Sequence, residues 1–216
     1  KGASDFVKVY QVPLSGGEPW EISCGLKRGE VKLPPPALVP YAHLQSVFTQ
    51  DGEVRHRVRY RVRNLSLQFL TLRLPAKATV WSVFVDGKPK RLHSEGEQSL
   101  IPLPKRSAAD LSFDVELIYA TPPVGEFGFG SRLSLAGPVL ETPKVKAERT
   151  FWTVYTPAGY SCSGFGGNVA SAASAEADAV LLKADVQEYG RLAELAETTK
   201  GKQRSVAEGN LLRQQE

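Results

Sequence analysis

Five arginine side chains have a spacing that could bind an anion. Within segment 53–64 an arginine stands at every second position, at Arg55, Arg57, Arg59, Arg61 and Arg63. Between them stand Val54, His56, Val58, Tyr60 and Val62. Alternate side chains of an extended chain point to opposite faces, so the segment predicts a strand with one basic and one apolar face. Cations roughly 7 Å apart along such a strand could follow a chain of phosphate, sulfate or carboxylate groups.

The basic face has several interpretations. We favour a solvated face whose arginines pair with carboxylates on a neighbouring strand, for which Asp114 and Glu116 are the candidates. A second interpretation is a charged edge strand that prevents edge-to-edge association. The functional interpretations are a binding surface for an anionic polymer and a docking surface for another part of a parent protein. Nucleic acid is disfavoured, because the basic face of this strand has no aromatic ring on which a base could stack.

Other candidates for chemistry are less specific. The Ser161-Cys162-Ser163-Gly164 segment offers nucleophiles for a hydrolase, but it does not fit the G-x-S-x-G elbow. The glycines of segment 122–130 match neither the dinucleotide fingerprint nor the P-loop. His43, His56 and His93 have no spacing that builds a metal site, and we expect His56 to be a hydrogen-bonded core histidine. We therefore expect no catalytic residue, metal or cofactor.

The three tryptophans could form a platform for carbohydrate. They are Trp20, Trp81 and Trp152, and exposed aromatic rings on β-sandwiches are used in this way. Aromatic side chains more often pack in a core, which is the interpretation favoured here.

A hairpin must position the arginine strand. Residues 44–49 lead through the turn residues Asp51 and Gly52 into the strand. A two-residue loop would place Phe48 on the basic face. A three-residue loop, with Gly52 in the left-handed conformation, would place Phe48 opposite Val54. We favour the second register because it buries Phe48 with the valines.

Further strands recur at intervals of roughly ten residues, separated by turn residues. The predicted strands cover 5–12, 20–26, 65–74, 79–85, 88–92, 99–103, 111–119, 131–135 and 145–155. The Asp86-Gly87 turn is the clearest hairpin signal, strand 99–103 is expected at a sheet edge, and the proline-rich segment 33–40 is expected to be a connector without regular structure. This spacing predicts a mainly β fold, an antiparallel β-sandwich of the immunoglobulin-like or jelly-roll type over residues 1–157.

The composition changes after the predicted sandwich. Residues 158–178 are rich in Gly, Ala and Ser and are expected to be flexible. Residues 179–216 predict an α-helical hairpin, complete or truncated, whose first helix begins near Glu176. Ser205 and Glu208 have the spacing of a capping box, so the second helix is expected to begin there. One stripe of the first helix would carry its contacts: Leu181, Leu182, Val186, Tyr189, Leu192 and Leu195.

Composition sets the broad class. The chain has 216 residues, 42% of them hydrophobic and 23% charged, which is typical of a globular protein. It has no apolar run long enough for a membrane span, and its start without methionine suggests an internal segment of a longer polypeptide or a mature form. Cys24 and Cys162 are either one long-range disulfide or two small buried thiols, and we favour the thiols.

Four segments resemble parts of a known group of proteins. They are Val80-Trp81-Ser82-Val83-Phe84-Val85-Asp86-Gly87-Lys88-Pro89, Leu100-Ile101-Pro102-Leu103-Pro104, Val115-Glu116-Leu117-Ile118-Tyr119 and Phe151-Trp152-Thr153-Val154-Tyr155-Thr156-Pro157. Over residues 50–160 the chain resembles β-sandwich segments of large bacterial envelope-associated proteins of unknown function. The resemblance implies a periplasmic or secreted setting and brings no catalytic residues.

Together these features predict a non-catalytic structural or protein-interaction module of a larger extracytoplasmic bacterial protein. Its expected partners are other domains of the parent protein, or a second copy bound through the C-terminal helices. The first alternative is a module that binds a polyanion or carbohydrate through the arginine face, with Arg55, Arg57, Arg59, Arg61 and Arg63 as the ligand-binding residues. The second is a hydrolase that uses Ser161, Cys162 or Ser163.

Overall fold

The computed structural model describes residues 35–49, 52–105, 110–122, 132–143, 145–162, 164–199 and 201–213. The predicted strands at 5–12 and 20–26, with Trp20 and Cys24, lie outside these residues, as do the glycines of the 123–130 loop. The strands are β1 Ala37–Phe48, β2 Val54–Asn64, β3 Phe69–Arg73, β4 Thr79–Val85, β5 Lys88–Pro89, β6 His93–Glu95, β7 Gln98–Pro102, β8 Phe113–Thr121, β9 Val139–Leu140 and β10 Thr150–Tyr155. The helices are α1 Ser174–Thr198 and α2 Lys202–Arg213.

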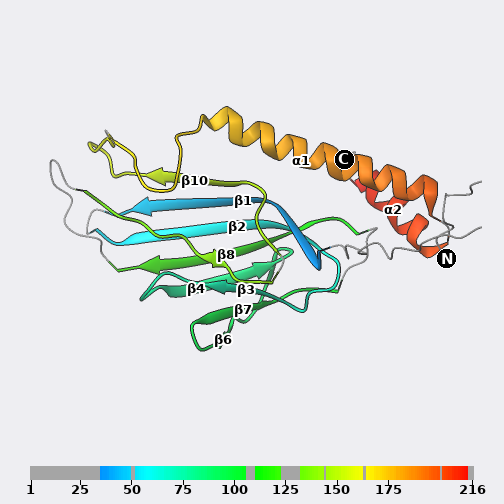
Figure 1. The fold of residues 1–216 in the computed structure, drawn as a ribbon, viewed down its shortest axis with the longest axis horizontal. Coiled ribbons are helices and arrows are strands. Elements are labelled where there is room, and N and C mark those ends of the chain that lie inside the picture. Colours follow the sequence, from blue (N-terminus) through cyan, green and yellow to red (C-terminus); the bar gives the residue numbers. More distant parts are fainter. Residues whose placement is uncertain are drawn as a thin grey trace, which may run out of the picture. The chain divides into compact units, whose positions relative to one another are not determined.

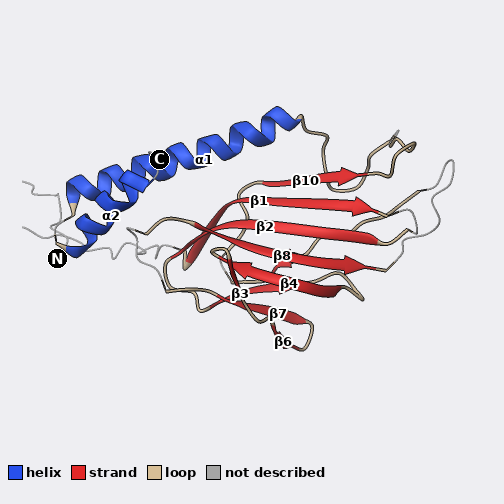
Figure 2. Ribbon diagram, turned by 180° about the vertical axis from the view of Figure 1, so that it is seen from behind, coloured by secondary structure: helices blue, strands red, loops and turns tan. Residues whose placement is uncertain are grey.

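The described strands form two sheets. The larger sheet has six strands in the order β10-β1-β2-β8-β4-β5, and the smaller has four in the order β6-β7-β3-β9 (Figures 1 and 2). Apolar side chains from both sheets belong to one hydrophobic cluster, to which β2 contributes Val58 and Val62, β3 contributes Leu70, and β7 contributes Ile101. The fold is therefore mainly β, as the strand spacing predicts, and the arginine strand lies inside the larger sheet.

The alternating segment is a strand, as predicted. In β2 the apolar positions are buried, while the side chains of Arg55, Arg57 and Arg59 are exposed. The preceding hairpin has the predicted register, with Phe48 opposite Val54. Gly52 has a φ of 82°, so it takes the left-handed conformation that the longer loop requires. The local pattern thus fixes which face of the sheet carries the arginines.

The expectation of a purely antiparallel fold is wrong at one edge. The last strand, β10, pairs with β1 in parallel, and an isolated parallel bridge between Val39 and Ala147 extends this contact. A strand's own pattern does not specify its partner, because the pairing joins segments far apart in the sequence. The larger sheet is therefore mixed.

Segment 33–40 was expected to lack regular structure, and this is wrong for its second half. Strand β1 begins at Ala37 and contains Pro40. The pairing of β1 with β2 shifts register between Leu38 and Tyr41. Pro40 lies within this irregularity, where a residue without an N–H group is tolerated.

Two further strand predictions also differ from the structure. Strand β7 was expected at an edge but lies between β6 and β3, because the unpredicted strand β6 forms a hairpin with it. Residues 132–135 form no strand, and the short β9 follows at Val139–Leu140 instead. The Asp86-Gly87 turn is confirmed, with positive φ at both residues and β5 returning along β4.

Two helices follow the sheets, but their starts differ from the prediction. Helix α1 begins at Ser174, within the segment expected to be flexible. Helix α2 begins at Lys202, so Ser205 lies inside the helix and is not its cap; its N–H bonds to the carbonyl of Gly201. Glu208 instead pairs with Arg204, one helical turn earlier. Neither described helix is long and apolar enough to cross a bilayer.

Candidate functional site

The arginine row pairs with carboxylates from the neighbouring strand. Glu116 of β8 lies 2.6 Å from Arg57 and 3.6 Å from Arg59. Asp114 of the same strand lies 3.9 Å from Arg59 and 3.3 Å from Arg61. These are the two carboxylates that the sequence indicated, and their pairing with the row is confirmed.

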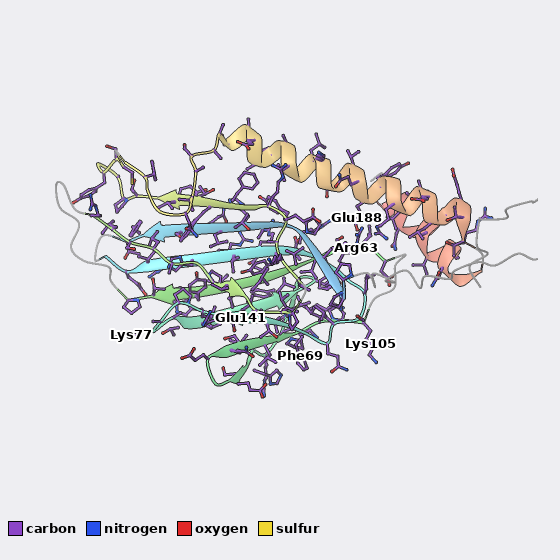
Figure 3. The ribbon with its side chains drawn as sticks, viewed as in Figure 1. Arg63, Phe69, Lys77, Lys105, Glu141 and Glu188 are labelled. Carbon is purple, nitrogen blue, oxygen red and sulfur yellow. The ribbon has the colours of Figure 1, made fainter. Side chains whose placement is uncertain are left out.

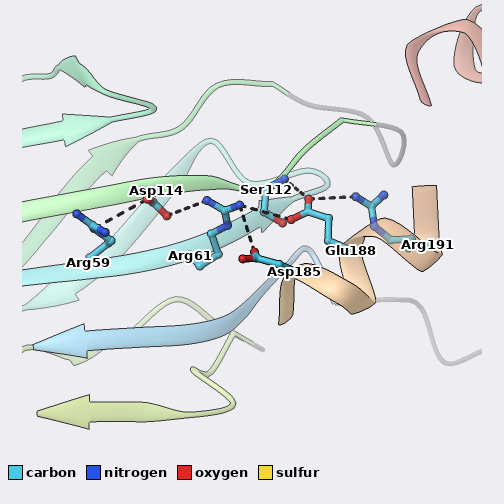
Figure 4. Close-up of polar contacts among 7 residues, drawn as sticks. All are labelled: Arg59, Arg61, Ser112, Asp114, Asp185, Glu188 and Arg191. Carbon is cyan, nitrogen blue, oxygen red and sulfur yellow. Dashed lines mark hydrogen bonds and ion pairs between the residues drawn. The ribbon is translucent and has the colours of Figure 1, made fainter. Parts of the chain in front are cut away.

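Helix α1 supplies the next carboxylates at the end of the row where Arg61 lies. The guanidinium of Arg61 is 3.8 Å from Asp185 and 3.7 Å from Glu188 (Figure 4). Arg55, at the other end, pairs with Glu53 at 3.4 Å. Four arginines of the row are therefore contacted by five carboxylates, Glu53, Asp114, Glu116, Asp185 and Glu188.

Glu188 joins α1 to the sheet. Glu188 is only 6% exposed, although its side chain carries a charge. It lies near Arg63, where α1 meets the sheet (Figure 3). One of its carboxylate oxygens accepts a hydrogen bond from the backbone N–H of Ser112. The same oxygen accepts a second hydrogen bond from the guanidinium of Arg191, which lies 3.4 Å away. Arg191 also donates to the carbonyl of Asp110 at 3.1 Å. Buried charges persist when they are paired and hydrogen-bonded in this way.

Burial and the neighbouring charges act in opposite directions on the pKa of Arg191. Burial lowers the pKa of Arg191, and the nearby charge of Arg63 lowers it further. The carboxylate of Glu188 opposes both effects through its charge and its hydrogen bond. Glu188 therefore stabilises a guanidinium that burial alone would disfavour.

A small cavity borders this cluster. It has a volume of about 80 Å³ and is lined by residues of β1, β2 and α1, including Pro40, Arg63 and Gln187. Such a volume holds a few water molecules, whereas pockets for small-molecule substrates measure roughly 300–1,000 Å³. The arrangement is suited to fixing a helix on a sheet.

His56 is a hydrogen-bonded core histidine, as predicted. Its ring nitrogens lie 2.8 Å from the hydroxyl of Ser46 and 3.0 Å from that of Thr121. The ring stacks on Tyr119, with 4.6 Å between centroids. Burial lowers the pKa of His56 to about 4, so the ring is neutral at neutral pH. Within the described residues, no group of three or more His, Cys, Asp or Glu side chains could hold a metal ion.

The structure describes two of the three nucleophile candidates, and both are exposed. Cys162 is a free thiol and is exposed, so the expectation of a buried thiol is wrong for this residue. Ser161 is also exposed, and Ser163 lies outside the described residues.

The two described tryptophans have different environments. Trp152 packs against the core and donates a 2.8 Å hydrogen bond to Ser46, as expected of a core ring. Trp81 is about half exposed, so the expectation of core packing is wrong for it. The guanidinium of Arg55 lies 5.1 Å from the centroid of the Trp81 ring, a cation–π contact.

Sequence reasoning missed Asp185 and Glu188. Glu188 stands at helical spacing from Leu192 and Leu195, on a face otherwise filled by apolar side chains. A single acidic residue on an apolar helix face is a signal for a buried ion pair. The residues that it would meet, Arg61 and Ser112, are distant in the sequence and could not be identified in this way.

Comparison with known proteins leaves the family open. No protein-family model matches the sequence, and no curated protein matches it. Part of the fold is similar to an M1 zinc metallopeptidase from Deinococcus radiodurans, with a TM-score of 0.34 at 20% identity over 40% of this chain and 20% of that chain. Leukotriene A4 hydrolase from Saccharomyces cerevisiae gives a TM-score of 0.40 at 15% identity over 56% of this chain and 24% of that chain.

A third similar structure is aminopeptidase A from Legionella pneumophila. The TM-score is 0.33 at 14% identity, over 43% of this chain and 11% of that chain. This chain thus spans less than a quarter of the length of each of these enzymes. At such identities and scores the likeness concerns backbone segments alone, and nothing about the activity of this chain follows from it.

Proposed function

We propose that this chain is a non-catalytic interaction module of a larger extracytoplasmic bacterial protein. In this proposal a β-sandwich holds a helical hairpin and presents the outer face of α1 to a helix of a partner or of another domain. The extracytoplasmic setting is supported by the resemblance of residues 50–160 to segments of envelope-associated proteins. The observation that carries the proposal is an apolar stripe on α1 that faces solvent.

The C-terminal part of α1 is held on the rest of the chain. Leu192 and Ala196 are buried against Ala207 of α2, and Glu188 connects the helix to β2 and β8. These contacts limit rotation of the helix about its axis. Leu182, Val186 and Tyr189 lie on the part of α1 that precedes Leu192, and they are therefore presented in a fixed direction.

The outer stripe consists of Leu182, Val186 and Tyr189. Leu182 is 66% exposed and Val186 is 62% exposed, and Tyr189 is exposed as well. These residues were expected to pack, together with Leu192 and Leu195, on the sandwich or on a second copy of the helices, and the exposure of Leu182 and Val186 rules out the first arrangement for these two. Their spacing of four and then three residues is that of a coiled-coil seam, which a second helix can cover.

The flanking charges indicate what kind of helix would fit. The exposed charged residues of α1 are five acidic residues, Glu176, Asp178, Asp185, Glu194 and Glu197, and one basic residue, Lys183. A second copy of α1 would bring like charges together along the seam, which disfavours a homodimer. We therefore assign the stripe to a partner helix with an apolar seam and basic flanks.

The polyanion alternative loses support because the arginine row is paired. Each of the four arginines from Arg55 to Arg61 has a carboxylate within 4 Å in the same chain. A polyanion would have to compete with these carboxylates, so the row offers little net positive charge.

Designed amphipathic peptides test the proposal directly. A helical peptide with leucine at its seam positions and lysine at the flanking positions is expected to bind the chain, whereas the same peptide with glutamate flanks is not. Binding is measured by fluorescence anisotropy, and light scattering reports the oligomeric state of the chain alone. The Leu182→Glu/Val186→Glu variant is expected to lose binding, because it places two charges in the seam.

Leu212→Glu in α2 is the matched control, since Leu212 is also 66% exposed but lies outside the stripe. Binding that is unaffected by Leu182→Glu/Val186→Glu would contradict the proposal. A concentration-dependent dimer that this variant abolishes would assign the stripe to a second copy instead.

A further inference from the structure

We propose that the outer face of the larger sheet binds a neutral polysaccharide, at the end of the arginine row where Arg55 lies. This site does not depend on the helix-binding role of α1. It consists of one row of side chains that crosses five strands and ends at two exposed aromatic rings.

The strand register places these side chains in line. Tyr155 of β10 lies beside Val47 of β1, and Val47 lies beside Arg55 of β2. Arg55 lies beside Ala120 of β8, and Ala120 in turn pairs with Thr79 of β4. Adjacent strands are about 4.8 Å apart, so the row from β10 to β4 is about 19 Å long. That length is sufficient for a short oligosaccharide lying across the strands.

A bulge in β4 supplies the second aromatic ring. The pairing of β4 with β8 shifts register between Val80 and Ser82, so Trp81 is the extra residue at this point. Bulges of this kind re-aim a side chain. Trp81 contacts Arg55 from the outer face, and the small side chain of Ala120 on the intervening strand leaves room for that contact. The cation–π contact fixes the ring where it remains about half exposed.

The mixture of side chains favours carbohydrate over a protein partner. Val47, Tyr155 and Trp81 are each about half exposed, but Arg55 lies between them in the row and carries its partner Glu53 beside it. A protein interface has a continuous apolar centre with a polar rim, which this row does not provide. A sugar chain alternates apolar C–H faces, which stack on aromatic rings, with hydroxyl groups, which both donate and accept hydrogen bonds.

The charges of the row favour a neutral ligand. Arg55 can donate to hydroxyl groups and Glu53 can accept from them, and the two side chains are already paired at 3.4 Å. A neutral polysaccharide can hydrogen-bond to both members of the pair without separating them. An acidic polysaccharide would be attracted to Arg55 and repelled by Glu53, so it gains less.

Affinity electrophoresis in gels that contain soluble polysaccharides tests the proposal. The panel comprises neutral β-glucan, xylan and galactomannan, with the acidic polymers alginate and heparin for comparison. We expect at least one neutral polymer to retard the wild-type chain, with little effect of salt. Trp81→Ala is expected to weaken this binding by about tenfold or more, as truncation of a central aromatic contact does, and Tyr155→Ala to weaken it less.

Phe69→Ala is the matched control, because Phe69 is an exposed aromatic residue of β3, in the smaller sheet. It is expected to leave retardation unchanged, and circular dichroism checks that each variant is folded. Retardation that Trp81→Ala leaves intact would overturn the proposal, as would the absence of retardation by every neutral polymer. Retardation by the acidic polymers alone, with a steep salt dependence, would also overturn it and would support a polyanion site.

Discussion

Replacing Glu188 should loosen α1 from the sheet. The Glu188→Ala substitution removes the acceptor of the Ser112 N–H group and a carboxylate that neutralises Arg61 and Arg191. Removing one partner of a buried ion pair typically costs 3–5 kcal/mol. Arg61 is partly exposed and keeps Asp114 as a partner, so we expect the lower end, about 3 kcal/mol of the free energy of unfolding. Glu188→Gln keeps an oxygen that can accept from Ser112 and should cost about 1–2 kcal/mol.

Urea unfolding measures these free energies, and amide hydrogen exchange locates the effect. Exchange should accelerate in α1 more than in β2, because the lost contacts are those that hold the helix. Glu194→Gln is the matched control, since Glu194 is an exposed acidic residue of the same helix. An unfolding free energy for Glu188→Ala within about 0.5 kcal/mol of wild type, with unchanged exchange in α1, would refute the structural role of Glu188.

Two further predictions concern the core. The pKa of His56 is lowered to about 4 in the folded chain against about 6.5 when unfolded, so the unfolded state binds the proton more readily in acid. The stability associated with the neutral ring is fully present above pH 6.5, and the free energy of unfolding should fall by about 3 kcal/mol as the pH drops to 4. Urea unfolding at a series of pH values measures this dependence, and His56→Gln should make it flatter. Tyr119 is fully buried, and its hydroxyl has no hydrogen-bond partner among the described residues. Tyr119→Phe should therefore leave the melting temperature unchanged or raise it, and a loss above about 1 kcal/mol would show that the hydroxyl is bonded.

Local patterns predicted the features that depend on neighbouring residues. The alternation in segment 53–64 identified β2 and its basic face, and the choice between two registers followed from burying Phe48 opposite Val54. The pairing of the row with Asp114 and Glu116 also followed, because those carboxylates alternate on a strand of complementary pattern. Each of these predictions used only the side-chain period and the tendency of charges to pair across strands.

The features that were missed depend on distant segments. The parallel pairing of β10 joins residues more than a hundred positions apart, as in the pair of Ala42 and Thr150. The exposure of Trp81 depends on a bulge that is set by its pairing with β8. Glu188 was overlooked because its partners belong to β2 and to the start of β8. The residue pattern within one segment cannot specify which other segment of the chain that segment contacts.

Heparin chromatography tests most directly whether the arginine row is neutralised within the chain. At about 0.15 M salt the wild-type chain should not be retained, whereas Asp114→Asn/Glu116→Gln should be retained because Arg57 and Arg59 lose their carboxylate partners and Arg61 loses one of three. Glu194→Gln/Glu197→Gln changes the net charge equally on α1 and should elute with the wild type. Retention of the wild type that Arg57→Gln/Arg59→Gln abolishes, or identical elution of the two double carboxylate variants, would contradict the account.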